Sequence, residues 1–369
     1  MVLEEIVQPL LNWFDQNARV LPWRENPSAY RVWVSEIMLQ QTRVEAVKPY
    51  YQRFLAELPD VEALARCQEE RLLKLWEGLG YYNRVRNMQS AAKTVVEEYQ
   101  GEFPKDYKKL QKLKGIGSYT AGAIASIAYQ IPAPAVDGNV LRVLSRLLAS
   151  EKDILKASVK KEFEEMVMDI IPEERPGAFN QALMELGAMV CVPNGEPHCK
   201  ECPLREYCLA NREGKTDYIP VKSTKKERRI EKRTVLIIRD GERVVLRKRP
   251  NKGLLAGLYE LPNIPGTMSM EEALAYVKEQ DFLPIRIQQL EDARHIFSHV
   301  EWHMTGYMVR VEEIEKPQNY LLVEPEDTKE KFPIPAAFRA YTKYVQIRLG
   351  QEKFKEEKDE DFIGSDTKL

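Results

Sequence analysis

A Gly-x-Gly turn followed by an aspartate is the part of this sequence with the clearest potential for chemistry. The turn spans Gly115 and Gly117, and Asp137 follows a run of small residues at 120–128. Such a turn leaves backbone N–H groups unpaired at a helix start, where they suit a phosphate oxygen. Small side chains would let the next helix approach closely and hold the Asp137 carboxylate near that phosphate. The alternative is an ordinary helical hairpin with Asp137 as a turn residue.

Four of the five cysteines lie in a second short segment, at Cys191, Cys199, Cys202 and Cys208. Clustered thiolates with one Cys-x-x-Cys pair indicate a metal or an iron–sulfur cluster, because disulfides are uncommon in the cytosol. A zinc ribbon normally has two close pairs. Here one pair is flanked by single cysteines, which favours a 4Fe-4S cluster and leaves zinc as the alternative. Cys67 lies alone in a helical context and is interpreted as a packing residue.

The elements that must position these residues are helices over roughly the first 210 residues. Residues 30–42, 140–148 and 179–187 repeat apolar side chains at helical spacing, and Ser28 is a plausible start for the first of them. After the cysteines, two β-branched runs surround Asp240-Gly241, which predicts a hairpin. A helix after Ser269 and a strand over 302–311 complete an α+β pattern.

These patterns predict a multidomain chain with an all-α domain followed by an α+β domain. The parts are a helical domain at 1–215 with the hairpin at 113–125 and the cysteine loop at 191–208, a basic linker at 216–233, an α+β domain at 234–349 and a disordered charged tail at 350–369. The linker's Lys and Arg side chains either follow phosphates or keep the connection soluble.

Length and composition limit the number of domains and the class of protein. A chain of 369 residues should hold two domains, and it has no apolar stretch long enough to span a membrane. The start lacks the basic end and apolar core of a secretion signal, so we expect a cytoplasmic, nucleoid-associated monomer. The net charge of -2 says little about whether the protein binds nucleic acid, because salt screens charges beyond about 10 Å and local patches matter more.

The hairpin, the 136–139 element and the cysteine loop together resemble the endonuclease III superfamily of helix-hairpin-helix base-excision glycosylases. Within it, the chain looks like a MutY-type adenine DNA glycosylase over nearly its full length. Further matching segments are Leu21–Arg24, Glu36–Thr42, Glu77–Arg86 and Phe297–His299. The resemblance implies base-excision repair, in which adenine paired with 8-oxoguanine or guanine is removed from duplex DNA. It also implies a 4Fe-4S cluster as cofactor.

By this resemblance, Glu36 and Asp137 divide the chemistry of breaking the bond to adenine. Glu36 lies among apolar residues, where desolvation would raise its pKa and keep a proton for nitrogen N7 of the base. Asp137 would stabilise the sugar cation or form a transient adduct, positioned by Tyr119 and Asn139. Lyase members of the superfamily carry a nucleophilic Lys where this chain has Tyr119, which excludes a Schiff base there.

Other matched residues concern the flipped-out base, the DNA and the lesion. Trp23, Arg24 and Gln181 are expected to line the adenine pocket. Residues expected at the DNA or the lesion are Gln41, Thr42, Leu79, Tyr81, Gly115, Gly117, Phe297, Ser298 and His299. The second domain resembles a Nudix fold, but its helix from Met268 lacks the Glu-rich pattern of Nudix hydrolases. We therefore expect it to read 8-oxoguanine and not to hydrolyse nucleotides.

One departure from the family pattern and three rival functions complete the sequence interpretation. Seven residues separate the first two cluster cysteines where the family usually has six, and this loop holds Glu196 but no Lys or Arg. Lys200 and Arg205 would then help contact DNA. The rivals are a lyase acting on pyrimidine lesions, an iron–sulfur DNA-binding protein without catalysis and a nucleotide-pyrophosphate hydrolase. His295, His299 and His303 recur at every fourth residue, but no nearby ligand completes a metal site.

Overall fold

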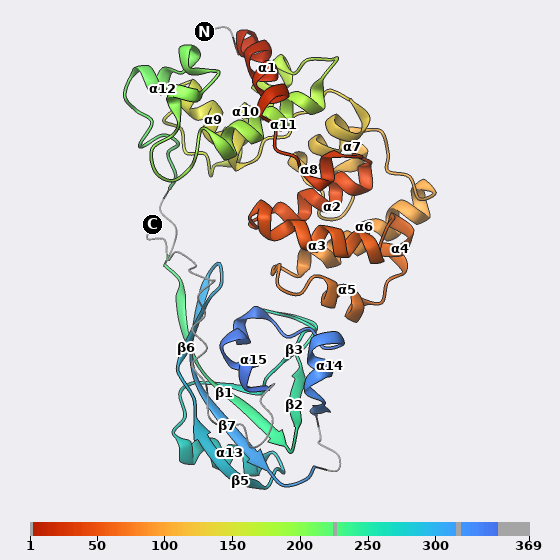
Figure 1. Ribbon diagram of the computed structural model, residues 1–369, viewed down its shortest axis with the longest axis vertical. Coiled ribbons are helices and arrows are strands. Elements are labelled where there is room, and N and C mark those ends of the chain that lie inside the picture. Colours follow the sequence, from red (N-terminus) through yellow and green to blue (C-terminus); the bar gives the residue numbers. More distant parts are fainter. Residues whose placement is uncertain (1–2, 224–226, 315–318, 346–369) are drawn as a thin grey trace. The chain divides into compact units, whose positions relative to one another are not determined.

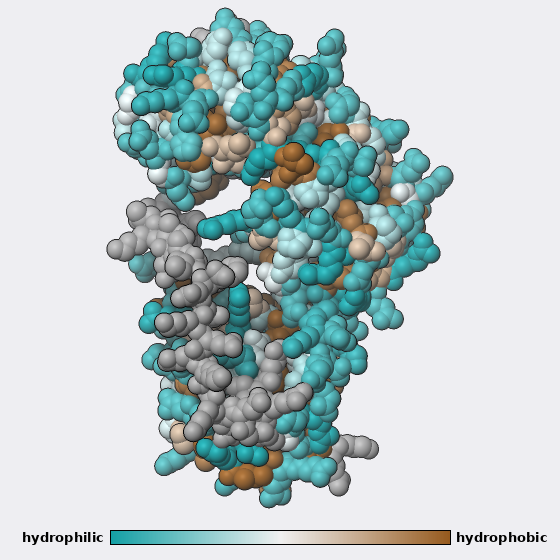
Figure 2. All heavy atoms as spheres, in the orientation of Figure 1, coloured by the Kyte–Doolittle hydropathy of each residue, from teal (hydrophilic) through white to brown (hydrophobic). Residues whose placement is uncertain are grey.

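The computed structural model describes residues 3–223, 227–314 and 319–345 (Figure 1). Two compact units are present, Met1–Lys226 and Glu227–Leu369. Among the described residues, no helix combines the length and apolar character needed to cross a membrane. In the view of Figure 2 the surface is mainly hydrophilic, with small separate hydrophobic patches. The expected charged tail at 350–369 lies outside the described residues.

The described part of the first unit is built from helices alone. Its α-helices are α1 (Val7–Asn17), α2 (Ala29–Leu39), α3 (Val44–Glu57), α4 (Val61–Arg66), α5 (Glu69–Leu75), α6 (Asn83–Tyr99), α7 (Tyr107–Leu110), α8 (Ser118–Ala123), α9 (Gly138–Leu147), α10 (Ala157–Ile170), α11 (Pro176–Met189) and α12 (Leu209–Arg212). Short 3-10 turns are η1 (Leu3–Ile6), η2 (Pro22–Arg24), η4 (Cys199–Glu201) and η5 (Arg205–Tyr207), and α8 continues into a π-helical turn, η3 (Ile124–Ala128).

Helix α1 packs with α9, α10 and α11, which come more than a hundred residues later in the chain (Figure 1). Their shared core includes Leu10, Leu144, Phe163 and Phe179, all of them buried. Side-chain caps set where the key helices start. The Ser28 hydroxyl accepts the Arg31 N–H at the start of α2, 3.3 Å away, as expected from the sequence.

The second unit is a mixed sheet between two helical layers. The strand order is β3-β2-β1-β7-β5, with β4 on β1, β6 on β7 and β8 on β2. Strands β1 and β7 run parallel, and the other pairs are antiparallel. The strands are β1 (Arg229–Asp240), β2 (Arg243–Lys248), β3 (Tyr259–Glu260), β4 (Asn263–Pro265), β5 (Pro284–Gln289), β6 (Ala293–Ile296), β7 (Val300–Val311) and β8 (Leu321–Val323).

Successive apolar side chains of β1 point to opposite faces of the sheet and so contribute to both cores. Val235 and Ile237 join the core under α15, while Leu236 and Ile238 join the core under α13. The helical elements are α13 (Met270–Glu279), α14 (Pro325–Glu330), η6 (Ala336–Phe338) and α15 (Arg339–Val345). Ser269 caps α13 in a reciprocal capping box with Glu272, which uses the Glu272 carboxylate in the fold.

The connection between the units is shorter than the basic linker expected at 216–233. Ile219 is buried, and its carbonyl oxygen accepts a hydrogen bond from Arg146 Nε at 2.8 Å. The Val221 carbonyl accepts the Ile154 N–H at 3.1 Å. At the C-terminal end of the expected linker, β1 already begins at Arg229, because the backbone of this charged segment pairs with the parallel strand β7. The hairpin turn is Gly241-Glu242, one residue beyond the expected Asp240-Gly241.

Candidate active site

Glu36 lies on α2, a helix with most of its residues buried, and is itself only 7% exposed. The Tyr119 hydroxyl, from α8, donates a hydrogen bond to Glu36 Oε2. The pKa of Glu36 is raised to about 7, mainly by burial; the Tyr119 hydrogen bond and Arg24 lower this pKa, and the nearby Asp137 contributes to the rise. Glu36 is therefore a carboxyl group that can hold a proton near neutral pH.

Asp137 is the N-cap of α9, and its carboxylate is fixed by three hydrogen bonds. Its Oδ1 accepts the backbone N–H of Asn139 at 2.9 Å and of Val140 at 2.8 Å, and its Oδ2 accepts Asn139 Nδ2 at 2.8 Å. Burial raises the pKa of Asp137, whereas these hydrogen bonds and the charge of Arg142 oppose the rise. The N-cap geometry stabilises the ionised form.

The fold brings the two carboxyl groups together from helices a hundred residues apart. Asp137 lies close enough to raise the pKa of Glu36, and the pKa of the half-buried Tyr119 is raised by burial and by both carboxyl groups. Two carboxyl groups with unequal environments can act as an acid and as a charge stabiliser in cleavage of a glycosidic bond. The site thus contains the elements that this chemistry needs.

Close backbone packing holds the segment that precedes Asp137. A Cβ at Gly122 of α8 would lie 1.9 Å from the Pro134 carbonyl oxygen, and one at Gly187 of α11 would lie 2.6 Å from Asn139 Cβ. The buried Asn180 side chain accepts the Ala135 N–H at 3.1 Å. The small residues after the hairpin therefore allow the close approach that the sequence suggested.

We expect Gly122→Ala to destabilise the first unit by about 2–3 kcal/mol, because the added methyl meets a backbone carbonyl that cannot turn aside. The free energy of unfolding in urea measures this effect. Gly117→Ala is the matched control, since a Cβ there has open space within 4 Å and φ is -88°. Equal stability of the two variants would contradict the proposed packing constraint.

Arg24 bonds Gln181, which is also expected in the base pocket, and Glu185, which was not expected there. Its Nε donates to Gln181 Oε1 at 3.0 Å, and its Nη2 donates to Glu185 Oε2 at 2.9 Å. Trp23 is buried with its ring edge-on to Tyr51, 5.5 Å between centroids. Sequence reasoning missed Glu185, which is 2% exposed. The available signal was a lone Glu among apolar residues in 182–187.

Gln41 and Tyr81, expected at the DNA, are both exposed and both have left-handed backbone conformations, with φ of 59° and 47°. Non-glycine residues adopt this region at a cost, and such strain concentrates at functional sites. Thr42 lies partly exposed in the same turn, where its backbone N–H bonds the Leu39 carbonyl at 3.2 Å. Leu79 differs from the others, because it is buried.

Arg84, which sequence reasoning also did not single out, forms hydrogen bonds to both of these loops. Its Nη1 donates to the carbonyls of Ile37 and Gln40 at 2.6 and 2.7 Å, and its Nη2 donates to Leu79 and Gly80 at 2.9 and 3.2 Å. Burial lowers the pKa of Arg84 to about 10. One guanidinium therefore satisfies carbonyls from both strained loops.

The Gly-x-Gly turn expected to bind a phosphate oxygen is a sharp turn before α8. Gly115 has φ of 80°, the left-handed region that favours glycine, while Gly117 is the extended N-cap of α8 with no side-chain cap bond. The Ser118 hydroxyl donates to Glu164 Oε1 at 2.6 Å. The turn leaves space around Gly117 in which a ligand can approach the backbone.

All four clustered cysteines, Cys191, Cys199, Cys202 and Cys208, line one pocket, together with Arg146 and Arg205. Arg146 Nη1 lies 3.3 Å from Cys191 Sγ, and Arg142 Nε donates to the Cys191 carbonyl at 2.7 Å. Four thiols beside arginines are a donor set suited to an anionic iron–sulfur cluster. Within the described residues, no three Cys, His, Asp or Glu side chains are spaced to hold one metal ion.

Arg142 also joins this cysteine loop to the carboxylate site. Its Nη2 donates to Asn139 Oδ1 and to the Gly187 carbonyl, each at 2.8 Å. Because Asn139 in turn bonds Asp137, a continuous set of hydrogen bonds connects the Cys191 backbone to the Asp137 carboxylate.

In the second unit, Phe297, Ser298 and His299 form the turn between β6 and β7. The Phe297 ring packs edge-on against Trp302 and His295, with centroids 4.9 and 4.6 Å apart. Ser298 and His299 are exposed. The packed phenyl ring therefore anchors a turn whose next two side chains face solvent.

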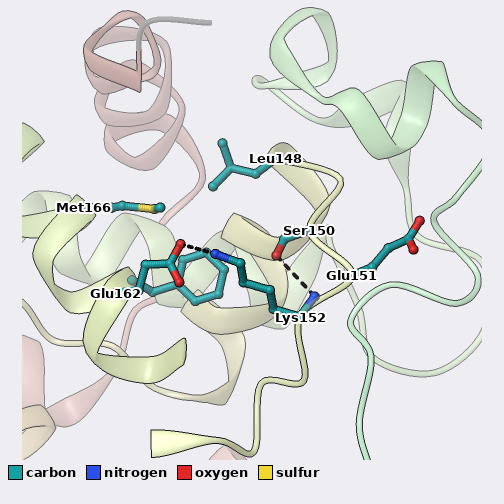
Figure 3. Close-up of a pocket in the computed structure, with 7 residues that line it drawn as sticks. Leu148, Ser150, Glu151, Lys152, Glu162 and Met166 are labelled. Atoms are coloured by element: carbon teal, nitrogen blue, oxygen red, sulfur yellow. Dashed lines mark hydrogen bonds and ion pairs between the residues drawn. The ribbon is translucent and has the colours of Figure 1, made fainter. Parts of the chain in front are cut away.

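A separate pocket of about 530 Å³ lies between the end of α9 and α10 (Figure 3). Its lining includes Leu148, Phe163 and Met166, and a Lys152–Glu162 ion pair of 2.5 Å crosses it. None of its lining residues is among the candidate site residues, so we assign the chemistry to the two carboxyl groups and not to this pocket.

Comparison with known proteins gives two matching family models. The HhH-GPD superfamily of base excision DNA repair proteins matches residues 34–168, and the NUDIX domain matches residues 234–344. The adenine DNA glycosylase of Mus musculus is 36% identical over 82% of this chain and 70% of its own length. That of Buchnera aphidicola subsp. Acyrthosiphon pisum is 34% identical over 82% of this chain and 86% of its own.

Among solved structures, a thermostable thymine-DNA glycosylase is similar to the first unit. The two share 25% sequence identity with a TM-score of 0.51, over 57% of this chain and 97% of that one. This similarity agrees with the all-α fold expected for the first part of the chain.

Proposed function

Since this chain belongs to the family of adenine DNA glycosylases, we propose that it hydrolyses the bond between adenine and deoxyribose in duplex DNA where adenine is paired with 8-oxoguanine or guanine. The observation that carries the proposal is the pair of Glu36 and Asp137, one buried acid and one N-cap carboxylate, with Tyr119 hydrogen-bonded to Glu36.

In the proposed reaction, protonated Glu36 donates its proton to N7 of adenine and so improves the leaving group. The C1′–N9 bond then breaks, and its electron pair leaves with the base. The Asp137 carboxylate stabilises the sugar cation or bonds to C1′ transiently, as in glycoside hydrolysis. Water completes the reaction, with Glu36 as base, and leaves free adenine and an abasic site. Asn139 and Tyr119 hold the two carboxyl groups in place.

The base must leave the helix stack before this chemistry can occur, at a cost of a few kcal/mol. We assign its pocket to Trp23, Arg24 and Gln181. Exposed Gln41 and Tyr81, with Thr42 beside them, would occupy the space that the base leaves, and Leu79 would support them from inside the loop. Backbone N–H groups after Gly115 and Gly117 would bind a phosphate.

We assign recognition of 8-oxoguanine to the turn Phe297–His299 of the second unit. Ser298 and His299 are exposed and carry hydrogen-bonding groups, while Phe297 is held by Trp302. Two acidic side chains of this unit, Glu272 and Glu260, have structural partners. Glu272 closes the α13 cap, and Glu260 accepts Arg247 Nη2 at 2.7 Å.

We expect no lysine-dependent lyase step, because Tyr119 occupies the position at which lyase members of the superfamily carry the nucleophilic lysine. We expect no covalent enzyme–DNA product when borohydride is added during the reaction. A product trapped through a lysine would contradict this assignment. We also propose action in the cytoplasm, on the nucleoid, by a monomer, in keeping with a DNA substrate.

Cys191, Cys199, Cys202 and Cys208 would hold a 4Fe-4S cluster, which would organise the loop around it. We expect about four iron and four sulfide per purified chain, and loss of both in Cys202→Ser. Cys67→Ser is the matched control, since Cys67 does not line the pocket. Stoichiometric zinc without iron would contradict the cluster.

The direct test of function uses a duplex with adenine opposite 8-oxoguanine. We expect free adenine to be released, with strand breakage only after alkali. The same duplex with thymine in place of adenine should be inert. Binding without any base release would favour the non-catalytic alternative. Release of an oxidised pyrimidine from a separate duplex that contains one would favour the lyase alternative.

A further inference from the structure

Glu185 of α11 is a buried carboxylate that receives five hydrogen bonds from two arginines. Arg19 donates its backbone N–H at 3.1 Å and its Nε at 2.7 Å to Oε1, and its Nη2 at 3.0 Å to Oε2. Arg24 donates Nη1 to Oε1 at 3.3 Å and Nη2 to Oε2 at 2.9 Å. The reaction described above assigns Glu185 no role.

The Glu185 carboxylate is ionised, and both of its oxygens accept hydrogen bonds from Arg19 and Arg24. Burial alone would raise its pKa, but the hydrogen bonds from Arg19 and Arg24 outweigh burial and lower the pKa to about 2. Two cations therefore face one anion, which leaves one net positive charge behind the base pocket.

Arg24 connects Glu185 to Gln181 and also lowers the pKa of Glu36. Its Nε bonds Gln181 Oε1, and Gln181 Nε2 bonds the Gly177 carbonyl at 3.2 Å, so the orientation of the Gln181 amide is set through Arg24. The charged and titratable groups that act on Glu36 are Tyr119 from α8, Asp137 from the start of α9 and Arg24 from η2. Arg24 is the sole cation in this set.

We propose that Glu185 is a positioning residue for base excision, which holds Arg24 and Gln181 at the base pocket and limits the positive charge that Glu36 experiences. This inference rests on the proposed function. A carboxylate that merely joined helices would have no reason to engage the one arginine that also bonds Gln181 and acts on Glu36.

The charge arrangement predicts opposite effects for two variants. Glu185→Gln removes an anion, so the proton on Glu36 becomes easier to lose. The pH at which single-turnover adenine release falls to half its plateau should move down by about half a unit. Arg19→Gln removes a cation while Arg24 keeps its bond to Glu185, so that midpoint should move up. A merely structural defect would slow release without moving the midpoint in opposite directions.

The experiment measures release under excess enzyme from about pH 5.5 to 9, with DNA binding followed by anisotropy and folding by thermal melting. Asp15→Asn is the matched control, because Asp15 of α1 pairs with Arg175, the N-cap of α11, at 2.6 Å but does not act on Glu36. Its midpoint should equal that of the unaltered protein.

The outcomes separate the inference from the function on which it rests. If the unaltered protein releases no adenine, the proposed function fails. If it releases adenine and Glu185→Gln keeps the same midpoint, the positioning role is overturned. Should Glu185→Gln fail to fold, Arg19→Gln decides, since an upward shift supports the role and an unchanged or lower midpoint refutes it.

Discussion

Asp137→Asn is expected to abolish measurable adenine release while leaving the protein folded. An asparagine oxygen can still accept the N–H groups of Asn139 and Val140, so the start of α9 should survive. The negative charge that faces the developing sugar cation is lost, however, and we expect single-turnover release to fall by about a thousandfold or more. Thermal melting and DNA binding should change little.

Asp60→Asn is the matched control for this variant. Asp60 also caps a helix, with its Oδ1 accepting the Ala63 N–H at 2.7 Å at the start of α4, but it is not a candidate site residue. Its release rate should equal that of the unaltered protein. Normal turnover by Asp137→Asn would remove Asp137 from the reaction.

Glu36→Gln is expected to combine a loss of activity with a gain of stability at alkaline pH. Without a proton donor, release should fall by about two to four orders of magnitude. The stability effect follows from the pKa of Glu36, which is about 7 in the folded protein against an ordinary value of 4.5. The folded state therefore binds this proton more tightly than the unfolded chain does.

The sign of the pH dependence follows from that difference. The contribution of Glu36 to stability is full below about pH 4.5 and is lost as pH rises through about 7. Because glutamine does not ionise, Glu36→Gln should exceed the unaltered protein in unfolding free energy at pH 8.5 by up to about 3 kcal/mol. Urea unfolding at pH 5 and 8.5 measures both values. A stability difference that is the same at both pH values would show that Glu36 has an ordinary pKa.

Local sequence signals were sufficient for much of the architecture. Ser28 and Ser269 start helices through contacts within three residues, and the runs flanking Asp240 predict strands because pairing there needs one tight turn. The expected family resemblance and the combination of a helical domain with a Nudix-like α+β domain are confirmed. The catalytic and binding roles of individual residues stay predictions.

Contacts between distant parts of the chain could not be predicted in the same way. Arg19 and Glu185 are separated by 166 positions, and a lone Glu or Arg on a helix usually faces water. Arg84 binds carbonyls, which every residue possesses, so no pattern of side chains marks its partners. The first part of β1, residues 229–233, was assigned to the linker for a related reason. Its backbone finds a partner in β7, while its side chains are charged.

The shared attachment of two strained loops to Arg84 has a consequence for how this protein can change over time. A lysine offers its N–H donors from a single point and cannot span the carbonyls of Gln40 and Gly80 as a planar guanidinium does. Loss of that one side chain would free Gln41 and Tyr81 together. The two loops should therefore evolve in concert, so that an altered turn in one survives only when the other adjusts with it.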